Sequence, residues 1–321
     1  MNRRDFVKLG GLVSMSFLFG GCEPAETAKS IEDSPKDLSQ IATIENTGLS
    51  DVYMTKEINS SGLVKVYRML NVQPSGKIAI KISTGEPGSN YLRPELIQDL
   101  IVSLNNVTIV ECNTIYGRFR GNTQSHLKVA EQHGFTKLAP VEIMDADGYI
   151  SIPVKNGRSI KENFVGKTFT NYDYFIVLSH FKGHTMAGFG GAIKNTSIGI
   201  ASARGEGNIH SNNFIESMSE AGKSVTDALN GNILYINVMN RLSLDCDCEE
   251  NPREPDIHDI GILSSLDPVA LDQACVDLIK TASNSKNFVK QIEELQGERT
   301  LQHGEEIGWG SRKYRLIDID V

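Results

Sequence analysis

The chain has 321 residues, of which 40% are hydrophobic and 22% are charged; this composition is that of a folded globular protein and excludes a disordered one. Its 40 acidic and 32 basic side chains give a net charge of −8, which excludes the basic field that a nucleic-acid-binding surface needs. Beyond the N-terminus, no apolar run approaches the roughly 20 residues that span a bilayer.

The first 22 residues have the pattern of an export signal. The pair Arg3-Arg4 resembles a twin-arginine motif, and residues 9–20 form an uncharged, mostly apolar stretch. This stretch is too short for a membrane anchor and is typical of a signal peptide. The alternative is a buried N-terminal helix, in which each of two adjacent glycines costs about 1 kcal/mol relative to alanine.

The apolar stretch ends in two glycines and Cys22, similar to a bacterial lipoprotein cleavage site, although Phe19 stands where leucine is usual. We therefore predict lipidation at Cys22 and membrane contact through this lipid only. Residues 23–44 are polar and predict a flexible tether. The expected location is the periplasmic or outer face of a bacterial cell envelope, after export by the twin-arginine pathway.

From about residue 45 to the end, strand-like and helix-like patterns alternate. β-Branched runs predict strands, and apolar residues at helical spacing predict helices. The expected strands are 77–83, 107–112, 141–144, 174–178, 233–238 and 257–263, and the expected helices are 94–104, 122–133, 213–229 and one that begins after Asp267-Pro268. This order predicts an α/β fold with a mostly parallel β-sheet, helices on both faces and a single large domain over residues 45–321.

Local chemistry predicts where the last of these helices begins. The side chain of Asp267 can accept hydrogen bonds from the free N–H groups of the first turn, and Pro268 fits the first helical position because its missing donor costs nothing there. Cys275 then shares a face with Leu271 and Ala274, so we interpret it as a small core residue rather than a ligand.

The densest group of titratable side chains follows the predicted strand 174–178 and contains His180, Lys182 and His184. Ligands of open α/β sheets bind beyond the carboxyl ends of the strands, and histidine exchanges protons or binds metals near neutral pH. We therefore expect these three residues to be catalytic, the histidines as acid–base groups or metal ligands. The alternative is that the histidines only hydrogen-bond the loop backbone.

A glycine-rich turn follows this group. Gly190 and Gly191 let the backbone approach a ligand, and Lys194 together with Lys182 can neutralise a phosphate or carboxylate that Asn195 orients. The spacing matches neither a P-loop nor a dinucleotide-binding fingerprint. Turn geometry alone also accounts for the glycines.

Polar side chains also follow two other predicted strands. Glu86 comes after strand 77–83, and three side chains come after strand 107–112: Asn113, Tyr116 and Arg118. All four are expected to contact a small-molecule substrate, with a structural role as the alternative for each.

Cys246 and Cys248 form a second cluster within Asp245-Cys-Asp-Cys248. If this segment is extended, both sulfurs point to one side, and two thiolates suit a zinc or iron ion. They make only half of a tetrahedral site. The candidates to complete it are His258, Asp259, His180 and His184. The alternatives are a disulfide between the two cysteines, formed after export, or two free thiols.

These segments together resemble the uncharacterised Fe–S centre proteins of the domain-of-unknown-function 362 family. The matching stretches are 85–86, 113–118, 126–130 with 134–135, 178–184, 188–195, 246–248 and 259–275. The resemblance implies the α/β fold, whereas no activity of the family is settled.

Relatives in this family often carry a ferredoxin-like insertion with two four-cysteine motifs for [4Fe–4S] clusters, after the segment that corresponds to residues 203–210. This chain has no cysteine between Cys112 and Cys246. We therefore expect no [4Fe–4S] cluster of its own, and a separate redox partner if the protein transfers electrons.

Taken together, the residues predict an exported lipoprotein that binds a metal or a small anionic cofactor and acts on a small molecule, with redox chemistry as one option. The alternative is a non-catalytic lipoprotein that captures a small ligand in the same pocket, and a third interpretation is a structural or assembly factor. The concentration of titratable and soft-ligand groups favours the first, because a simple binding pocket more often uses aromatic side chains, which are 7% here.

Overall fold

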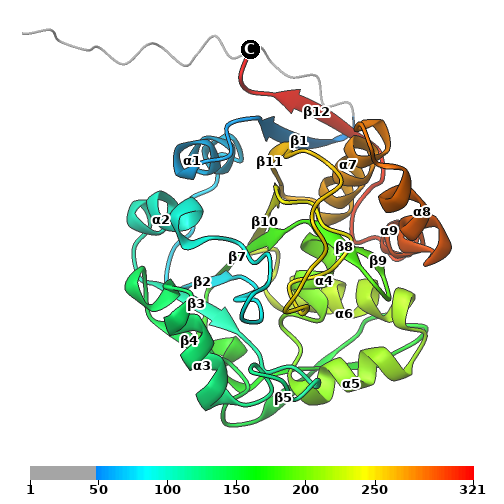
Figure 1. Cartoon of the computed structure of the whole chain (residues 1–321). Coiled ribbons are helices and arrows are strands. Elements are labelled where there is room, and N and C mark those ends of the chain that lie inside the picture. The colour runs from blue at the N-terminus through cyan, green and yellow to red at the C-terminus, as the bar shows by residue number, and fades with distance from the viewer. Residues whose placement is uncertain (1–47) are drawn as a thin grey trace, which may run out of the picture. The chain divides into compact units, whose positions relative to one another are not determined.

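An eight-stranded mixed sheet runs through the centre of the molecule (Figure 1). The computed structural model describes residues 48–321, so the predicted signal peptide and the whole of the predicted tether lie outside the described residues. Across the sheet, the strands are β12 (Tyr314–Asp318), β1 (Ser50–Thr55), β11 (Gly261–Ser265), β10 (Ile233–Met239), β7 (Tyr174–His180), β2 (Ile78–Lys81), β3 (Val107–Glu111) and β4 (Val141–Ile143).

Neighbouring strands of this sheet are parallel, except that β11 runs antiparallel to both β10 and β1. Two short antiparallel hairpins lie outside it. They pair β5 (Tyr149–Pro153) with β6 (Glu162–Gly166), and β8 (Lys182–His184) with β9 (Gly188–Gly190).

Helices cover both faces of the sheet. The α-helices of residues 48–321 are α1 (Ser60–Met69), α2 (Pro94–Ser103), α3 (Thr123–Gln132), α4 (Ala192–Ser197), α5 (Ala203–Ser211), α6 (Phe214–Ala228), α7 (Pro268–Thr281), α8 (Lys286–Glu294) and α9 (Gly297–Glu306). Side chains of α1 and α2 pack on one face, and those of α4, α6 and α7 pack on the other. The predicted α/β class, with its mostly parallel sheet and helices on both faces, is confirmed.

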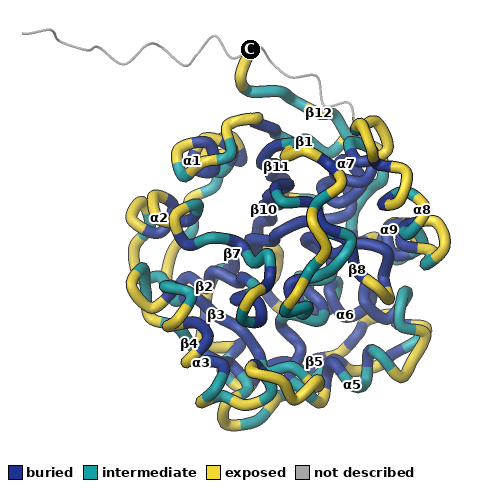
Figure 2. The backbone as a smooth tube through the Cα atoms, viewed as in Figure 1, coloured by how far each residue is buried: buried dark blue, intermediate teal, exposed yellow. Residues whose placement is uncertain are grey.

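Strand β7 shows how the sequence builds both cores. Phe175 and Val177 point to the face of α4, α6 and α7, whereas Ile176 and Leu178 point to the face of α1 and α2, because successive side chains of a strand alternate. All four are fully buried, so the strand is apolar on both sides, as parallel strands are when both faces are covered. Figure 2 shows the resulting buried centre under a more exposed shell.

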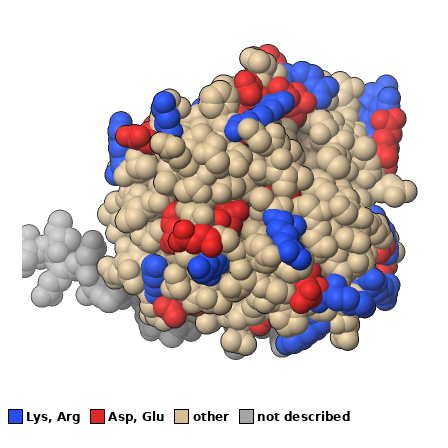
Figure 3. Space-filling view, turned by 90° about the horizontal axis from the view of Figure 1, so that it is seen from below, with Lys and Arg blue, Asp and Glu red and all other residues tan. Residues whose placement is uncertain are grey.

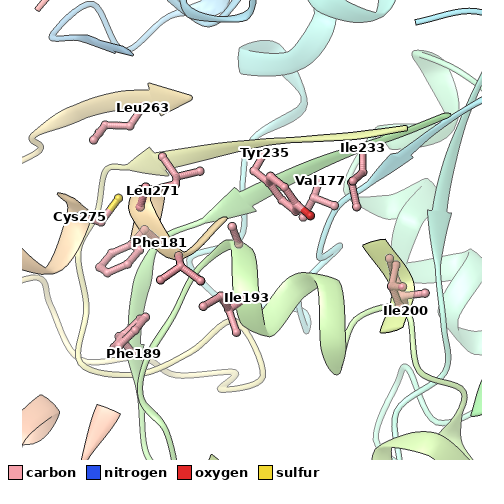
Figure 4. Packing of buried hydrophobic residues seen from close by; sticks show 14 of the residues in the cluster. Val177, Phe181, Phe189, Ile193, Ile200, Ile233, Tyr235, Leu263, Leu271 and Cys275 are labelled. Atoms are coloured by element: carbon pink, nitrogen blue, oxygen red, sulfur yellow. The ribbon is translucent and has the colours of Figure 1, made fainter. Parts of the chain in front are cut away.

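The first of these cores extends beyond the sheet. Figure 4 shows Phe181 and Phe189 next to each other near Ile193 and Leu271, and the two phenyl rings stack with centroids 5.5 Å apart. Cys275 is fully buried in the same cluster, which confirms its interpretation as a core residue.

The start of α7 also agrees with the sequence. The Asp267 carboxylate accepts hydrogen bonds from the N–H groups of Val269 (2.9 Å) and Ala270 (3.0 Å), so Asp267 caps the helix as expected.

The expected strand 257–263 is wrong in its first half, because the strand begins only at Gly261. Residues 257–260 lie outside any strand, and only Ile257 makes an isolated bridge, to Leu242. Asp259 instead accepts a hydrogen bond from the N–H of Arg241 at 2.6 Å. The side chain of Asp259 thus takes up a backbone N–H just beyond the end of β10.

On the molecular surface, acidic and basic side chains are interspersed among larger uncharged areas on the face that Figure 3 shows. Within residues 48–321, no helix combines the length and the apolar character needed to cross a membrane.

Candidate functional site

A cavity of about 70 Å³ lies beyond the carboxyl ends of β2, β3 and β7. From β2 the chain continues to β3 and β4 on one side of the sheet, and from β7 it continues to β10 on the other. The order of strands thus reverses between β2 and β7, which is where open α/β sheets bind ligands.

The structure brings most of the predicted site residues to this cavity. Its wall contains Asn113, Tyr116, His180, Lys182, Gly190, Gly191, Lys194, Asn195, Cys246 and Cys248. Three other predicted residues are not on the wall. Glu86 is buried and accepts a hydrogen bond from Arg120, Arg118 is exposed and donates to the carbonyl of Cys248, and His184 contacts loop backbone.

The Nδ1 atom of His184 accepts hydrogen bonds from the N–H groups of Met186 (3.2 Å) and Ala187 (3.1 Å). Burial, with Lys194 and Lys182 nearby, lowers the pKa of His184 well below its usual range. This geometry is that of the alternative interpretation, in which the histidine hydrogen-bonds the loop backbone.

Both ring nitrogens of His180 are engaged. Nδ1 lies 3.0 Å from the Asp247 carboxylate and Nε2 lies 2.7 Å from the carbonyl of Asn240, and Asp247 also binds Lys182. Burial alone would raise the pKa of Asp247, but Lys182 and His180 hold it well below its usual range. Asp247 therefore fixes the two predicted catalytic side chains in place as an ionised carboxylate.

The segment that contains Cys246 and Cys248 is a turn rather than the extended strand considered above. The N–H of Glu249 bonds back to the carbonyl of Cys246 at 3.0 Å, and the N–H of Cys248 bonds to the sulfur of Cys246 at 3.4 Å. Both sulfurs still reach the cavity, and no disulfide joins the two cysteines.

The two sulfurs differ in their electrostatic surroundings. A hydrogen bond from Cys246 and the nearby Arg120 lower the pKa of Cys248 well below its usual range, whereas the same hydrogen bond and burial raise that of Cys246. A guanidinium nitrogen of Arg120 lies 3.6 Å from the sulfur of Cys248. Arg120 thus favours the thiolate form of Cys248 over that of Cys246.

These two sulfurs do not complete a metal site. Within residues 48–321, no three His, Cys, Asp or Glu side chains are grouped so that they could hold a metal ion. His258 and Asp259 are absent from the cavity wall, and the ring nitrogens of His180 are engaged elsewhere. The donor set of the described residues therefore does not fit a closed zinc or iron site.

Sequence reasoning missed a buried charge network under the cavity. The fully buried ammonium of Lys81 lies 3.0 Å from the Glu111 carboxylate and 2.9 Å from the side-chain oxygen of Asn195. Arg120 binds Glu86 at 3.1 Å and lies 3.6 Å from Glu111. The signal was present for Lys81 and Glu111, because each is a charged residue at the end of an otherwise apolar run.

Lys194 differs from the other cations on the wall. Lys81, Arg120 and Lys182 each lie within 4.0 Å of a carboxylate, whereas Lys194 makes no such ion pair among the described residues. A Cβ atom at Gly190 would lie 3.3 Å from the Lys194 side chain. The glycine thus leaves space beside the unpaired lysine.

Gly191 has a structural reason of its own. A Cβ atom there would lie 2.4 Å from a carboxylate oxygen of Asp272. The two oxygens of this carboxylate accept hydrogen bonds from the N–H groups of Ala192 (2.8 Å) and Ile193 (2.9 Å). Close approach of the backbone to Asp272, rather than to a ligand, accounts for this glycine.

The profile of the domain of unknown function DUF362 matches residues 78–277, from β2 into α7. The chain belongs to the DUF362 family. The matched range contains the whole cavity wall, and it confirms the resemblance found in the sequence motifs. No curated protein matches this DUF362 chain.

Among solved structures, this DUF362 chain is similar to the lactate racemase apoprotein from Thermoanaerobacterium thermosaccharolyticum, with a TM-score of 0.41 and 14% identity over 71% of this chain and 56% of that one. It is also similar to a protein from Thermotoga maritima, with a TM-score of 0.39 and 11% identity over 77% of this chain and 58% of that one. The chain thus spans somewhat more than half the length of both proteins.

Proposed function

We propose that this protein binds a small anionic molecule in the cavity beyond β2, β3 and β7 and acts on it. The observation that carries the proposal is Lys194, a cation on the cavity wall without a carboxylate partner among the described residues. Lys182 lies near the same glycine: a Cβ atom added at Gly190 would be 4.0 Å from the Lys182 side chain. A carboxylate or phosphate between the two lysines would supply the missing counter-charge.

The cysteine pair supports an enzyme over a simple binding protein. Arg120 lies beside Cys248 on the wall of the same cavity and favours its thiolate form, and a thiolate is the nucleophilic form of cysteine. Redox or nucleophilic chemistry on the bound molecule is the proposed reaction class, with a separate redox partner where electrons are needed. In the non-catalytic alternative, the protein binds the anion in the same cavity but the cysteine pair has no role.

Isothermal titration with malonate and with inorganic phosphate tests the anion site. Lys194→Met should weaken the binding of the better probe by about tenfold or more, because a hydrogen bond to a charged group is worth roughly 1.5–3 kcal/mol. Lys290→Met is the matched control, since Lys290 lies on the exposed surface of α8. Equal affinity in both variants, or no binding of either probe to the unmodified protein, would overturn the proposal.

Zinc or iron at Cys246 and Cys248 stays a prediction from the sequence. Elemental analysis of anaerobically purified protein checks it, beside a Cys246→Ser/Cys248→Ser variant. Near-stoichiometric metal that is lost in the variant would establish a metal ion bound by the two cysteines. If both proteins are free of metal, the metal site is overturned and only the anion site remains proposed.

We further propose that the protein is exported by the twin-arginine pathway and anchored through a lipid on Cys22. The support is the arginine pair, the apolar stretch 9–20 and the glycines before Cys22. Fractionation of cells that express the full chain should place the protein with membranes and Cys22→Ala outside them. Equal membrane association of both forms would contradict lipidation.

A further inference from the structure

The cavity wall also contains a buried carboxylate oxygen without a hydrogen bond. Glu206 of α5 is 2% exposed, and its Oε2 atom accepts the N–H of Ile115 at 2.9 Å. Its Oε1 atom is buried and has no hydrogen-bond partner among the described residues. One oxygen of this carboxylate is therefore held by backbone while the other makes no hydrogen bond, and Glu206 is part of the cavity wall.

The neighbours of Glu206 do not satisfy this oxygen. The Nε2 atom of His210 is 3.8 Å away, which is beyond hydrogen-bond distance. Burial and Lys194 lower the pKa of His210, which disfavours the charged form of this ring. Burial raises the pKa of Glu206, and the N–H of Ile115, Tyr116 and Lys194 counter this shift. The hydroxyl of Tyr116 is thus close to the carboxylate, but it makes no hydrogen bond to Oε1 within 3.5 Å.

A second acceptor on the wall is in the same situation. The side-chain N–H of Asn113 donates to the hydroxyl of Thr123 at 3.1 Å, and the side-chain oxygen of Asn113 is buried without a partner. Buried polar atoms in proteins are nearly always hydrogen-bonded, to protein or to ordered water, and a ligand can take the place of such a water. Two acceptor atoms on one wall, with an unpaired lysine in the same cavity, thus point to a ligand that brings donors as well as negative charge.

We propose that the anion bound at Lys194 also carries a hydroxyl or ammonium group, which donates a hydrogen bond to Oε1 of Glu206. This inference rests on the proposed function and adds the class of ligand: a small hydroxy- or amino-substituted acid. The Asn113 oxygen offers a second acceptor for the same donor-bearing part of the ligand. A ligand that has the acid group but no hydroxyl or ammonium group would leave Oε1 buried and unpaired. A site with such an acceptor binds ligands that lack the donor much more weakly.

Three phosphonates of similar size test the proposal by isothermal titration: methylphosphonate, hydroxymethylphosphonate and aminomethylphosphonate. The unmodified protein should bind one of the two donor-bearing probes about tenfold more tightly than methylphosphonate, as expected for one hydrogen bond to a charged group. The tighter of these two probes identifies the donor as hydroxyl or ammonium.

Glu206→Gln provides the matched variant. Its amide oxygen can keep the bond to the N–H of Ile115, so that its NH₂ group faces the cavity and presents a donor instead of an acceptor. The preference for the donor-bearing probe over methylphosphonate, both measured on this variant, should therefore disappear. Glu131→Gln, at an exposed position of α3, is the control and should keep the preference.

Equal binding of all three probes to the unmodified protein would overturn the role of Glu206 and leave the anion site standing. A preference that survives in Glu206→Gln would also overturn it. Failure of the proposed function has a different signature, because methylphosphonate, malonate and phosphate would then all fail to bind or would bind Lys194→Met unchanged.

Discussion

Lys81 is a charged side chain at the end of a buried strand, and its environment explains how it is tolerated there. Its ammonium contacts the carboxylate of Glu111 and the side chain of Asn195. Burial lowers the pKa of Lys81, while Glu111 opposes this shift. Each charge is thus acceptable in the interior because the other is present.

Lys81→Met should therefore destabilise the protein strongly. We expect the free energy of unfolding to fall by about 3 kcal/mol, because the buried Glu111 carboxylate loses its closer cation and keeps only Arg120 at 3.6 Å. Urea denaturation measures this loss. The double variant Lys81→Met/Glu111→Gln should be more stable than the sum of the two single effects predicts, and strict additivity would show that the pair is not coupled.

At the scale of elements, Glu220 of α6 joins three parts of the chain. Its carboxylate accepts the N–H groups of Arg158 (2.7 Å), Ser159 (3.0 Å) and Ile160 (2.9 Å). It also lies 3.1 Å from the ring of His303 in α9. One side chain thus holds the loop before β6 and two helices together.

Glu220→Gln should lower the free energy of unfolding at pH 7 by about 2 kcal/mol, since hydrogen bonds to a charged group are replaced by weaker ones. Burial alone would raise the pKa of Glu220, but the backbone donors and His303 outweigh it and the net shift is downward. The ionised form is therefore favoured in the folded state, and its contribution is present above the unfolded pKa and lost as the pH falls through the lower folded pKa.

Urea denaturation of both proteins at a series of pH values checks this prediction. The stability difference should be constant above about pH 5 and should shrink as the pH falls below the unfolded value of roughly 4.3. Glu131→Gln serves as the exposed control. A difference that does not change on acidification would show that the charge of Glu220 is not what holds the elements together.

Elements with a strong local pattern could be predicted from the sequence. The strands β2, β3, β7 and β10 and the helices α2, α6 and α7 agree with hydrophobic periodicity and with the Asp267 cap. The turn at Cys246 could not be predicted, because its backbone geometry depends on contacts with Lys182 and His180, more than 60 residues earlier.

The same distinction applies to the site. Its location followed from the rule that ligands bind at the carboxyl ends of parallel strands, and the lysines and cysteines expected there line the cavity. Arg120, Asp247 and Glu206 were missed because each gains its role from a residue far away in sequence, such as Glu86 for Arg120. No local periodicity encodes such a pairing.

At the scale of the whole molecule, the two hydrophobic cores share one sheet. The single tryptophan of the chain, Trp309, is buried in the core on the face of α4, α6 and α7, whereas Ile176 belongs to the core on the opposite face. Because both cores rest on the same strands, we expect them to unfold together.

Ile176→Ala should therefore lower the urea midpoint of unfolding. The shift measured by tryptophan fluorescence should equal the shift measured by far-UV circular dichroism. The expected loss is about 2–5 kcal/mol, typical of a buried isoleucine replaced by alanine. Val177→Ala, on the face of Trp309, is the matched variant. A fluorescence midpoint that moves only with Val177→Ala would show that the two faces unfold independently.

The buried ion pairs under the cavity have one further consequence. Glu86, Arg120, Glu111 and Lys81 are oriented by one another in the folded chain, so the free-energy cost of aligning these charges belongs to folding. Bulk water would have to reorient around a charge that develops during a reaction, whereas these side chains are already oriented and need to move very little. The electric field at the sulfur of Cys248 is therefore set before any ligand arrives.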